Sequence, residues 1–238
     1  MDWLEGEIIG FDKPYRWTSF DVVGKTRWLL CHRLGFKKIK VGHTGTLDPL
    51  ATGVVVVCTG KKTKCIDELQ NHIKEYVATL QLGATTPSFD LEKGIDATYP
   101  TEHITRSFID EVIPTFKGEQ WQVPPVFSAV KVDGKRAYKL ARKGEQPELK
   151  PKKLVIDEIE VICFDADLMQ LTLRVVCSKG TYIRALARDI GQRLQSGAHL
   201  IQLRRTRVGD IRVEDCLQFS DFEKLIEVAS ATTTNDNN

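Results

Sequence analysis

Residues 42–53, Gly-His-Thr-Gly-Thr-Leu-Asp-Pro-Leu-Ala-Thr-Gly, combine one carboxylate with one imidazole in a short glycine-rich segment. Three glycines and a proline disfavour a regular helix, because glycine frees the backbone and proline lacks an amide donor. The apolar residues 54–58 follow directly and predict a strand. We therefore expect a structured loop at a sheet edge, where Asp48 and His43 could take part in catalysis. The alternative is an ordinary turn in which Asp48 caps backbone donors ahead of Pro49.

The composition indicates a soluble globular protein. Hydrophobic residues make up 42% and charged residues 28% of the 238 residues. No apolar run approaches the ~20 residues that cross a bilayer, and residues 1–5 lack the features of a signal peptide. The six cysteines include no Cys-x-x-Cys pair, which argues against zinc and against a disulfide framework. We expect a cytoplasmic protein with buried, reduced thiols.

Common cofactor motifs are missing from the sequence. No Gly-x-Gly-x-x-Gly follows a predicted strand, and neither Gly-x-x-x-x-Gly-Lys-Ser/Thr nor His-Glu-x-x-His occurs. The five histidines show no metal-ligand spacing. If the chain is an enzyme, these observations favour carboxylate chemistry without a cofactor or a metal.

Charge is strongly segregated although the net charge is only +2. Residues 127–153 hold nine Lys/Arg against three Asp/Glu, and residues 174–212 hold nine against two. Residues 154–173 and 213–238 are acidic. The basic stretches also carry Tyr138 and predict a surface for a polyanion such as nucleic acid. The alternative is a set of solvated faces.

The hydrophobic patterns predict alternating strands and helices without an internal repeat. A hairpin is expected over residues 130–135, because Asp-Gly suits a type I′ turn. We predict strands over residues 6–11, 54–58, 75–82, 155–164, 169–177 and 200–208, and helices over residues 18–34, 63–70, 105–116, 136–143, 181–194 and 221–228. The fold class is therefore α+β, a mixed and largely antiparallel sheet with flanking helices.

Four separated blocks together resemble the TruB family, the tRNA pseudouridine(55) synthases. Their order and spacing match over residues 6–212. The blocks are residues 42–53; residues 74–76 with 82–83 and 85–90; residues 122–131 with Tyr138 and 141–142; and residues 177–184 with 203–206. The resemblance implies a pseudouridine synthase-like fold. It also implies an enzyme that breaks the N-glycosidic bond of a T-loop uridine and rejoins the base through carbon 5, without cofactor or metal.

The resemblance places the catalytic aspartate of the family on Asp48. A carboxylate there could attack the ribose or the base as a nucleophile, or take a proton from the sugar as a general base. The arginine partner falls on Arg184, which the sequence without the resemblance would favour as a phosphate contact or a surface helix charge. His43 aligns with the histidine that fills the space left by the flipped base; the alternative is a loop hydrogen bond.

Three further residues align with the substrate pocket of the family. Tyr76 matches the tyrosine that stacks on the flipped base, and stacking is worth ~1–3 kcal/mol per base; otherwise it would be a core residue of its strand. Tyr182 and Leu203 match polar-aromatic and apolar pocket positions, although Leu203 alone suggests an ordinary core leucine. Lys131 is expected in the basic lining.

We expect one catalytic domain over residues 1–212, a short C-terminal segment over residues 213–229 and a disordered tail over residues 230–238. Many family members carry a C-terminal PUA module, which we do not expect here, so the expected RNA partner is the T-arm stem-loop of tRNA. We further expect a monomer with no obligate protein partner and no membrane association. Two alternative functions stay open: a non-catalytic tRNA-folding module, and a guide-RNA-dependent subunit of the dyskerin kind.

Overall fold

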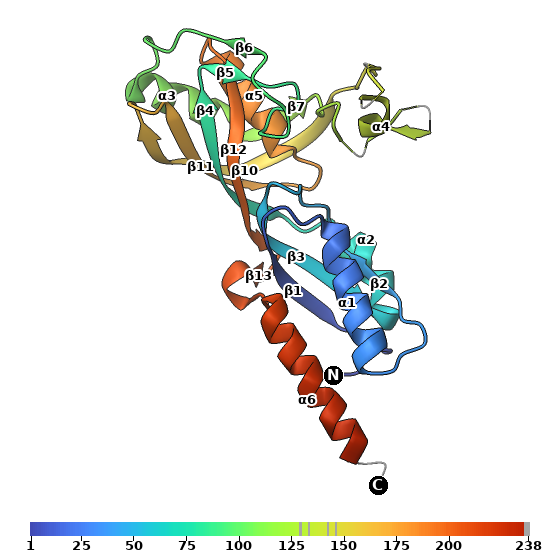
Figure 1. Cartoon of the computed structure of the whole chain (residues 1–238). Coiled ribbons are helices and arrows are strands. Elements are labelled where there is room, and N and C mark those ends of the chain that lie inside the picture. Colours follow the sequence, from blue (N-terminus) through green and yellow to red (C-terminus); the bar gives the residue numbers. More distant parts are fainter. Residues whose placement is uncertain (129, 133, 142, 146, 236–238) are drawn as a thin grey trace. The chain divides into compact units, whose positions relative to one another are not determined.

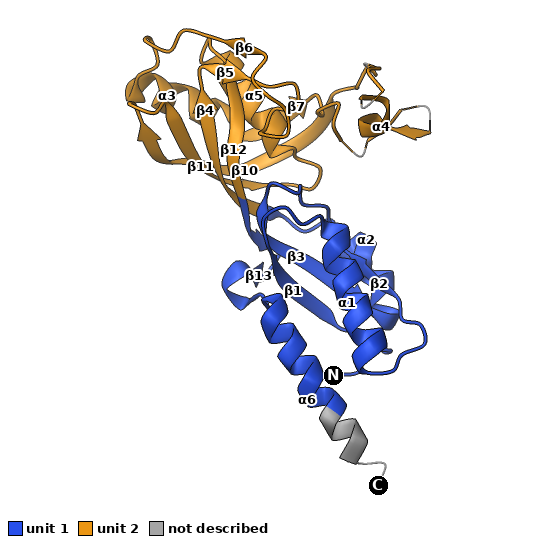
Figure 2. Ribbon diagram, in the orientation of Figure 1, with its two compact units in different colours: residues 1–74, 204–238 blue, residues 75–203 orange. Residues whose placement is uncertain are grey.

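The computed structural model describes residues 1–128, 130–132, 134–141, 143–145 and 147–235. The chain forms two compact units, and each is described by itself. Unit 1 comprises residues 1–74 and 204–238, and unit 2 comprises residues 75–203 (Figures 1 and 2). The expected catalytic domain over residues 1–212 thus includes all of unit 2 and most of unit 1.

Unit 1 is built around the strand β3 (Thr52–Thr59), in which seven of eight residues are buried. Strand β1 (Ile8–Lys13) and the short β2 (Val41–His43) pair with β3 in antiparallel orientation. The end of β12 (Ala198–Val208) pairs with β3 in parallel and then turns back through β13 (Ile211–Arg212). Strand β3 has partners on both sides and is an interior strand, whereas β2, which leads into the loop 42–53, pairs only with β3 among the strands that the structure describes.

Helix α1 (Ser19–Arg33) begins where the sequence predicts. Thr18 and Asp21 form a capping box, in which each side chain accepts a hydrogen bond from the backbone amide of the other residue. The predicted helix over residues 63–70 is a 3₁₀ turn, η1 (Gly60–Cys65), followed by one α-helical turn, α2 (Ile66–Leu69).

The C-terminal residues belong to unit 1. After the short η3 (Val213–Asp215), helix α6 (Phe219–Asn235) packs on β1, where the Phe11 ring stacks on Phe219 at 4.7 Å and meets Phe222 edge-on at 5.1 Å. The helix is assigned as far as Asn235, and the disordered tail that the sequence predicts over residues 230–238 stays a prediction. Alanines 229 and 231 favour continuation of the helix. Residues 236–238 of the predicted tail lie outside the described residues.

The strands of unit 2 lie in the order β12, β4 (Lys74–Leu82), β11 (Gln170–Cys177), β10 (Lys152–Asp165) and β7 (Gly118–Gln122). Strand β4 alternates buried and half-buried residues, as the period-2 pattern predicts. Helices α5 (Ile183–Arg193) and α3 (Arg106–Val112), with the 3₁₀ turn η2 (Ile113–Phe116), accompany these strands in Figure 1. One small sheet joins β5 (Ala84–Thr85) to β6 (Ala97–Thr98). Parallel and antiparallel pairs with flanking helices confirm the α+β class.

The predicted hairpin is confirmed in the residues that flank its turn. Strands β8 (Lys131–Val132) and β9 (Lys135–Arg136) pair in antiparallel register, and α4 (Ala137–Ala141) follows. Gly134 has φ +77°, as a type I′ turn requires. Asp133, the other turn residue, lies outside the described residues, as do Ala129 and Arg142 of the third sequence block. Within the described part of the chain, no helix is long and apolar enough to span a membrane.

Candidate functional site

The six candidate residues divide between the two units. His43 and Asp48 belong to unit 1, whereas the other four belong to unit 2. Those four are Tyr76, Tyr182, Arg184 and Leu203.

The segment 42–53 is a structured loop that links β2 to β3. The Ser19 hydroxyl at the start of α1 accepts a hydrogen bond from the Leu47 amide at 2.8 Å and donates to the Leu47 carbonyl at 3.2 Å. The Thr44 amide donates to the Val56 carbonyl, and the Ala51 amide donates to that of Asp48. The start and the middle of the loop are therefore fixed to the body of unit 1, and the Arg16 amide holds the Pro49 carbonyl at 2.8 Å.

The buried side chain of Arg205, on β12, also binds the main chain of this loop. Its guanidinium donates to the carbonyls of Val54 at 2.7 Å, Thr46 at 3.2 Å and Gly45 at 3.2 Å, and its exposed fraction is 2%. A buried arginine needs such partners because an unpaired charge in the interior costs several kcal/mol. The planar fork can reach several acceptors at once, so this side chain ties two points of the loop to Val54 of β3.

Lys13, at the end of β1, is fully buried beneath the loop. Its ammonium donates to the carbonyls of Trp17 at 2.6 Å, Pro14 at 3.1 Å and Pro49 at 3.4 Å. Burial lowers the pKa of Lys13 from 10.5 to about 8, and the charge of Asp48 partly opposes this shift. The residue directly after Asp48 is thus anchored by a buried cation that interacts electrostatically with Asp48 itself.

Asp48 is half-buried, and His43 lies five residues before it in the same loop. The Gly45 amide donates to Nδ1 of His43 at 3.2 Å, which requires an unprotonated Nδ1. Burial, and secondarily the charge of Arg205, lowers the pKa of His43. The imidazole is therefore neutral at pH 7, with its proton on Nε2, so the loop offers one N–H donor and one carboxylate.

In unit 2, Arg184 lies in the first turn of α5 with an exposed fraction of 5%. It donates to the carbonyls of Ser88 at 3.1 Å and Phe127 at 3.0 Å, and its Nε lies 3.5 Å from Oδ2 of Asp90. Both Ser88 and Asp90 are buried. Arg184 is thus a buried, paired cation, not the surface charge that sequence alone also allowed.

The segment 86–90 that faces Arg184 has an unusual backbone. Phe89 adopts a positive φ of +62°, a conformation that costs an L-residue energy. The Thr86 hydroxyl donates to the Asp90 carbonyl at 2.7 Å and closes the turn. Strained residues persist where the surrounding structure holds them, and they cluster at functional sites. With Phe89 in this conformation, the Ser88 carbonyl and the Asp90 carboxylate both lie beside the Arg184 guanidinium.

Tyr182 stands at the N-cap of α5 and is held through its backbone by Gln122 of β7. Its amide donates to Oε1 of Gln122 at 2.9 Å, and Nε2 of Gln122 donates back to its carbonyl at 3.2 Å. The half-buried Tyr182 side chain is therefore presented from a fixed backbone. Leu203, on β12, is 8% exposed and fits a core residue as well as a pocket residue.

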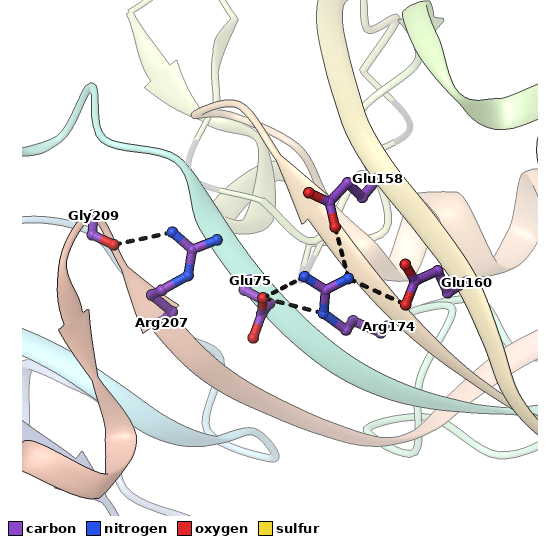
Figure 3. Close-up of polar contacts among 6 residues, drawn as sticks. All are labelled: Glu75, Glu158, Glu160, Arg174, Arg207 and Gly209. Atoms are coloured by element: carbon purple, nitrogen blue, oxygen red, sulfur yellow. Dashed lines mark hydrogen bonds and ion pairs between the residues drawn. The ribbon is translucent and has the colours of Figure 1, made fainter.

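Tyr76 lies on the buried face of β4, with an exposed fraction of 8%. Its neighbour Glu75 points to the opposite face, where Arg174 binds it at 2.9 Å and also binds Glu158 at 2.7 Å and Glu160 at 3.2 Å (Figure 3). Hydrogen bonding to Glu158 and Glu75 raises the pKa of Arg174. This cluster fixes β4 at Tyr76, although a buried face is also where an ordinary core tyrosine would lie.

Several residues that hold the site were not predicted individually from the sequence. Lys13, Arg205 and Gln122 act on main-chain atoms distant in sequence, and no local pattern marks them. Asp90 lies within a motif block that carried no assigned role. Ser128 also stands out, because its buried hydroxyl has no hydrogen-bond partner in the part of the chain that the structure describes. Lys131, expected in the basic lining, is exposed on β8.

The arrangement suits carboxylate chemistry on a rigid loop. Asp48 can act as nucleophile or general base, and the loop around it is braced by buried cations. Over the described residues, no group of three or more His, Cys, Asp or Glu side chains is placed to hold a metal ion.

Comparisons with known proteins point to one family. Residues 32–183 match the N-terminal domain of the TruB family pseudouridylate synthases, and residues 184–237 match the tRNA pseudouridylate synthase B C-terminal domain. The tRNA pseudouridine synthase B of Phocaeicola vulgatus is 66% identical over 227 residues, which cover 95% of this chain and 96% of that protein. The protein of that name from Bacteroides thetaiotaomicron is 62% identical over the full length of both.

A solved structure of a Cbf5-Nop10-Gar1 complex is also similar, with a TM-score of 0.68 and 30% identity. The match covers 93% of this chain and 54% of that one, so the chain spans about half the length of the solved relative. By its sequence and its fold, this chain belongs to the TruB family of pseudouridylate synthases.

Proposed function

We propose that this protein is a standalone tRNA pseudouridine synthase that converts the uridine at position 55 of the T loop to pseudouridine, with Asp48 as the catalytic residue. The observation that carries the proposal is the loop 42–53: it carries a single carboxylate, and its main chain is held by Lys13, Arg205 and Ser19. Such bracing fits a catalytic group, which must keep its geometry through the reaction.

The reaction is an isomerisation, and its atoms balance without a co-reactant. The bond from N1 of uracil to C1′ of the ribose breaks, and a bond from C5 to C1′ forms. The proton on C5 is then lost, and N1 gains one. Asp48 serves either as the nucleophile toward the ribose or the base, or as the base that removes a sugar proton. We assign no cofactor and no metal to the chemistry.

The uridine must leave its stacked position to reach Asp48, which costs a few kcal/mol. We assign Tyr76 to stacking on the flipped base, and Tyr182 and Leu203 to the walls of the pocket. We assign to Arg184 the role of the cation that interacts with the reacting groups. We assign to His43, a neutral hydrogen-bond donor, the role of filling the space in the RNA that the flipped base vacates. Arg184 is buried and paired with Asp90, so the position of its guanidinium is fixed, which supports its assignment.

The proposed RNA partner is the T-arm of tRNA, recognised by a monomer without an obligate protein partner. The basic residues 127–153 and 174–212 supply charge for this contact. We place the protein in the cytoplasm with its tRNA substrate.

The first prediction tests Asp48 directly. Asp48→Asn keeps the size of the side chain but removes the charge and the nucleophile, so we expect turnover to fall by at least about 10³-fold. The purified variant is incubated alone with unmodified tRNA, and pseudouridine is mapped at nucleotide resolution. Binding of the RNA and the unfolding free energy should change little.

Asp157→Asn, at an exposed position of β10, is the matched control and should retain full activity. Turnover by Asp48→Asn close to that of this control would show that the carboxylate is not catalytic. An inactive wild-type protein that becomes active with a guide RNA and partner proteins would instead favour the guide-dependent function. Binding without any conversion under either condition would favour a tRNA-folding module.

A further inference from the structure

A third basic region lies in unit 1. Residues 22–65 contain nine Lys/Arg and a single acidic residue, Asp48. Lys25 and Lys61 are paired with Glu223 and Glu5 at 2.6 Å, and Arg27 donates to a backbone carbonyl. The other six cations are exposed and have no ion pair among the residues that the structure describes. These six, called here the basic surface, are Arg33, Lys37, Lys38, Lys40, Lys62 and Lys64.

Hydrogen bonds connect the segments that carry the basic surface. Arg27 of α1 donates to the Val41 carbonyl of β2 at 2.9 Å, and the Gly60 amide of η1 donates to the Lys40 carbonyl at 2.9 Å. The end of α1, residues 34–40 and η1 are therefore parts of one surface. Two carboxylates, Asp67 and Glu68 of α2, follow η1, so the region keeps an excess of four positive charges.

Aromatic rings lie on α1, the helix that carries Arg33 of the basic surface. The Trp28 and His32 rings of α1 stack at 4.7 Å, and Trp28 remains 45% exposed. The Lys25 ammonium lies 5.4 Å from the Trp28 ring. Exposed rings among cations are typical of surfaces that contact nucleic acid, because they combine phosphate neutralisation with stacking.

We propose that the basic surface binds the phosphate backbone of the RNA stem whose loop reaches Asp48. The basic surface and the loop 42–53 belong to the same unit and are joined by β2, because Lys40 precedes β2 and β2 leads into the loop. The charge excess complements a polyanion. This inference rests on the proposed function for the identity of the RNA.

The test is charge reversal of Lys37 and Lys38, which lie in a segment without regular secondary structure. Lys37→Glu/Lys38→Glu should weaken binding of a fluorescent T-arm hairpin about tenfold at 0.1 M salt. It should also reduce the slope of log K against log salt by about 1.8, because each phosphate contact contributes about 0.9. Anisotropy titrations from 50 to 200 mM salt measure both quantities.

Lys117→Glu/Lys224→Glu is the matched control, since it changes the net charge equally at two other exposed lysines. It should change the affinity by less than about twofold. An unchanged salt slope for Lys37→Glu/Lys38→Glu, in a variant whose unfolding midpoint is normal, would overturn the proposal. An equal loss of RNA affinity in the control variant would also overturn it. So would intact RNA binding in Lys37→Glu/Lys38→Glu together with weaker binding to phosphatidylserine vesicles, because the surface would then bind lipid.

The titrations use an Asp48→Asn background, so they are independent of turnover. If the wild-type protein forms pseudouridine while the salt slope does not respond to the double variant, the inference fails and the proposed function stands. If the slope responds but the wild-type protein does not convert uridine, the proposed function fails and the surface remains an RNA-binding surface.

Discussion

The two units hold their candidate residues in opposite ways. In unit 1, the buried cations Lys13 and Arg205 bind main-chain carbonyls of the loop that carries Asp48. In unit 2, the cation Arg184 is itself the candidate, and it is held by two carbonyls together with the carboxylate of Asp90. In unit 1, buried cations therefore lie around the loop of the acidic candidate Asp48, whereas in unit 2 the carboxylate of Asp90 balances the charge of the basic candidate Arg184.

This difference has consequences for substitution. A carbonyl that loses its donor in a buried place costs about 1–3 kcal/mol, and it alters backbone geometry at that point. We therefore expect changes at the unit 1 cations to affect the shape and stability of the loop. Changes around Arg184 should affect mainly the charge and position of one side chain. Three predictions test this contrast.

The largest effect is expected at Arg184. Arg184→Lys keeps the charge but loses the planar fork, so it cannot reach the Ser88 and Phe127 carbonyls together with Asp90. We expect the single-turnover rate to fall about 10²-fold or more, as for loss of one preorganised donor. Arg188→Lys, one turn further along α5, is the control and should lose less than about threefold.

Asp90→Asn sharpens the same test. It leaves Arg184 in place without its carboxylate, so we expect a smaller loss of about tenfold in the rate, with RNA affinity unchanged. If Arg184→Lys were as active as the Arg188→Lys control, the fork would not matter, and the two units would not differ in the way described.

The next effect concerns Gly53, where β3 meets β12. Gly53 has φ +105°, and a Cβ there would lie 2.1 Å from the Arg205 carbonyl oxygen. Gly53→Ala should therefore lower the unfolding free energy by about 3 kcal/mol or more, from overpacking and backbone strain. Urea unfolding measures the change.

Gly45→Ala in the same loop provides the comparison. No atom lies within 4 Å of a Cβ built at Gly45, and its φ is not in the left-handed region. We expect a change of less than about 1 kcal/mol in the unfolding free energy. Equal losses for both variants would mean that the loop as a whole tolerates no side chain, whatever its contact with Arg205.

The sequence predicts most helices and strands and the candidate site residues, but not the side chains that hold those residues in place. The start of α1 near residue 18 and the alternation of β4 are predicted from local patterns, and both predictions are confirmed. Gln122 binds the backbone of Tyr182, 60 residues away, so only the fold reveals that pairing. The polar strand β7, with two exposed residues on a sheet edge, has too weak a hydrophobic pattern to be predicted.

The smallest effect is a pH dependence from Lys13. Its pKa in the folded protein is about 8, below the ordinary 10.5, because burial disfavours the charged form. Between these values the unfolded chain binds a proton that the folded protein lacks, so the stability contribution of Lys13 rises with pH in this window. Lys13→Met removes the titration. The unfolding free energy of the wild-type protein minus that of Lys13→Met should therefore rise by about 2 kcal/mol from pH 8 to pH 10. Urea unfolding of both proteins at pH 7, 8, 9 and 10 measures the difference. A difference that stays flat, or that falls with pH, would mean that Lys13 keeps its ordinary pKa and that the carbonyls of the loop fully replace its hydration.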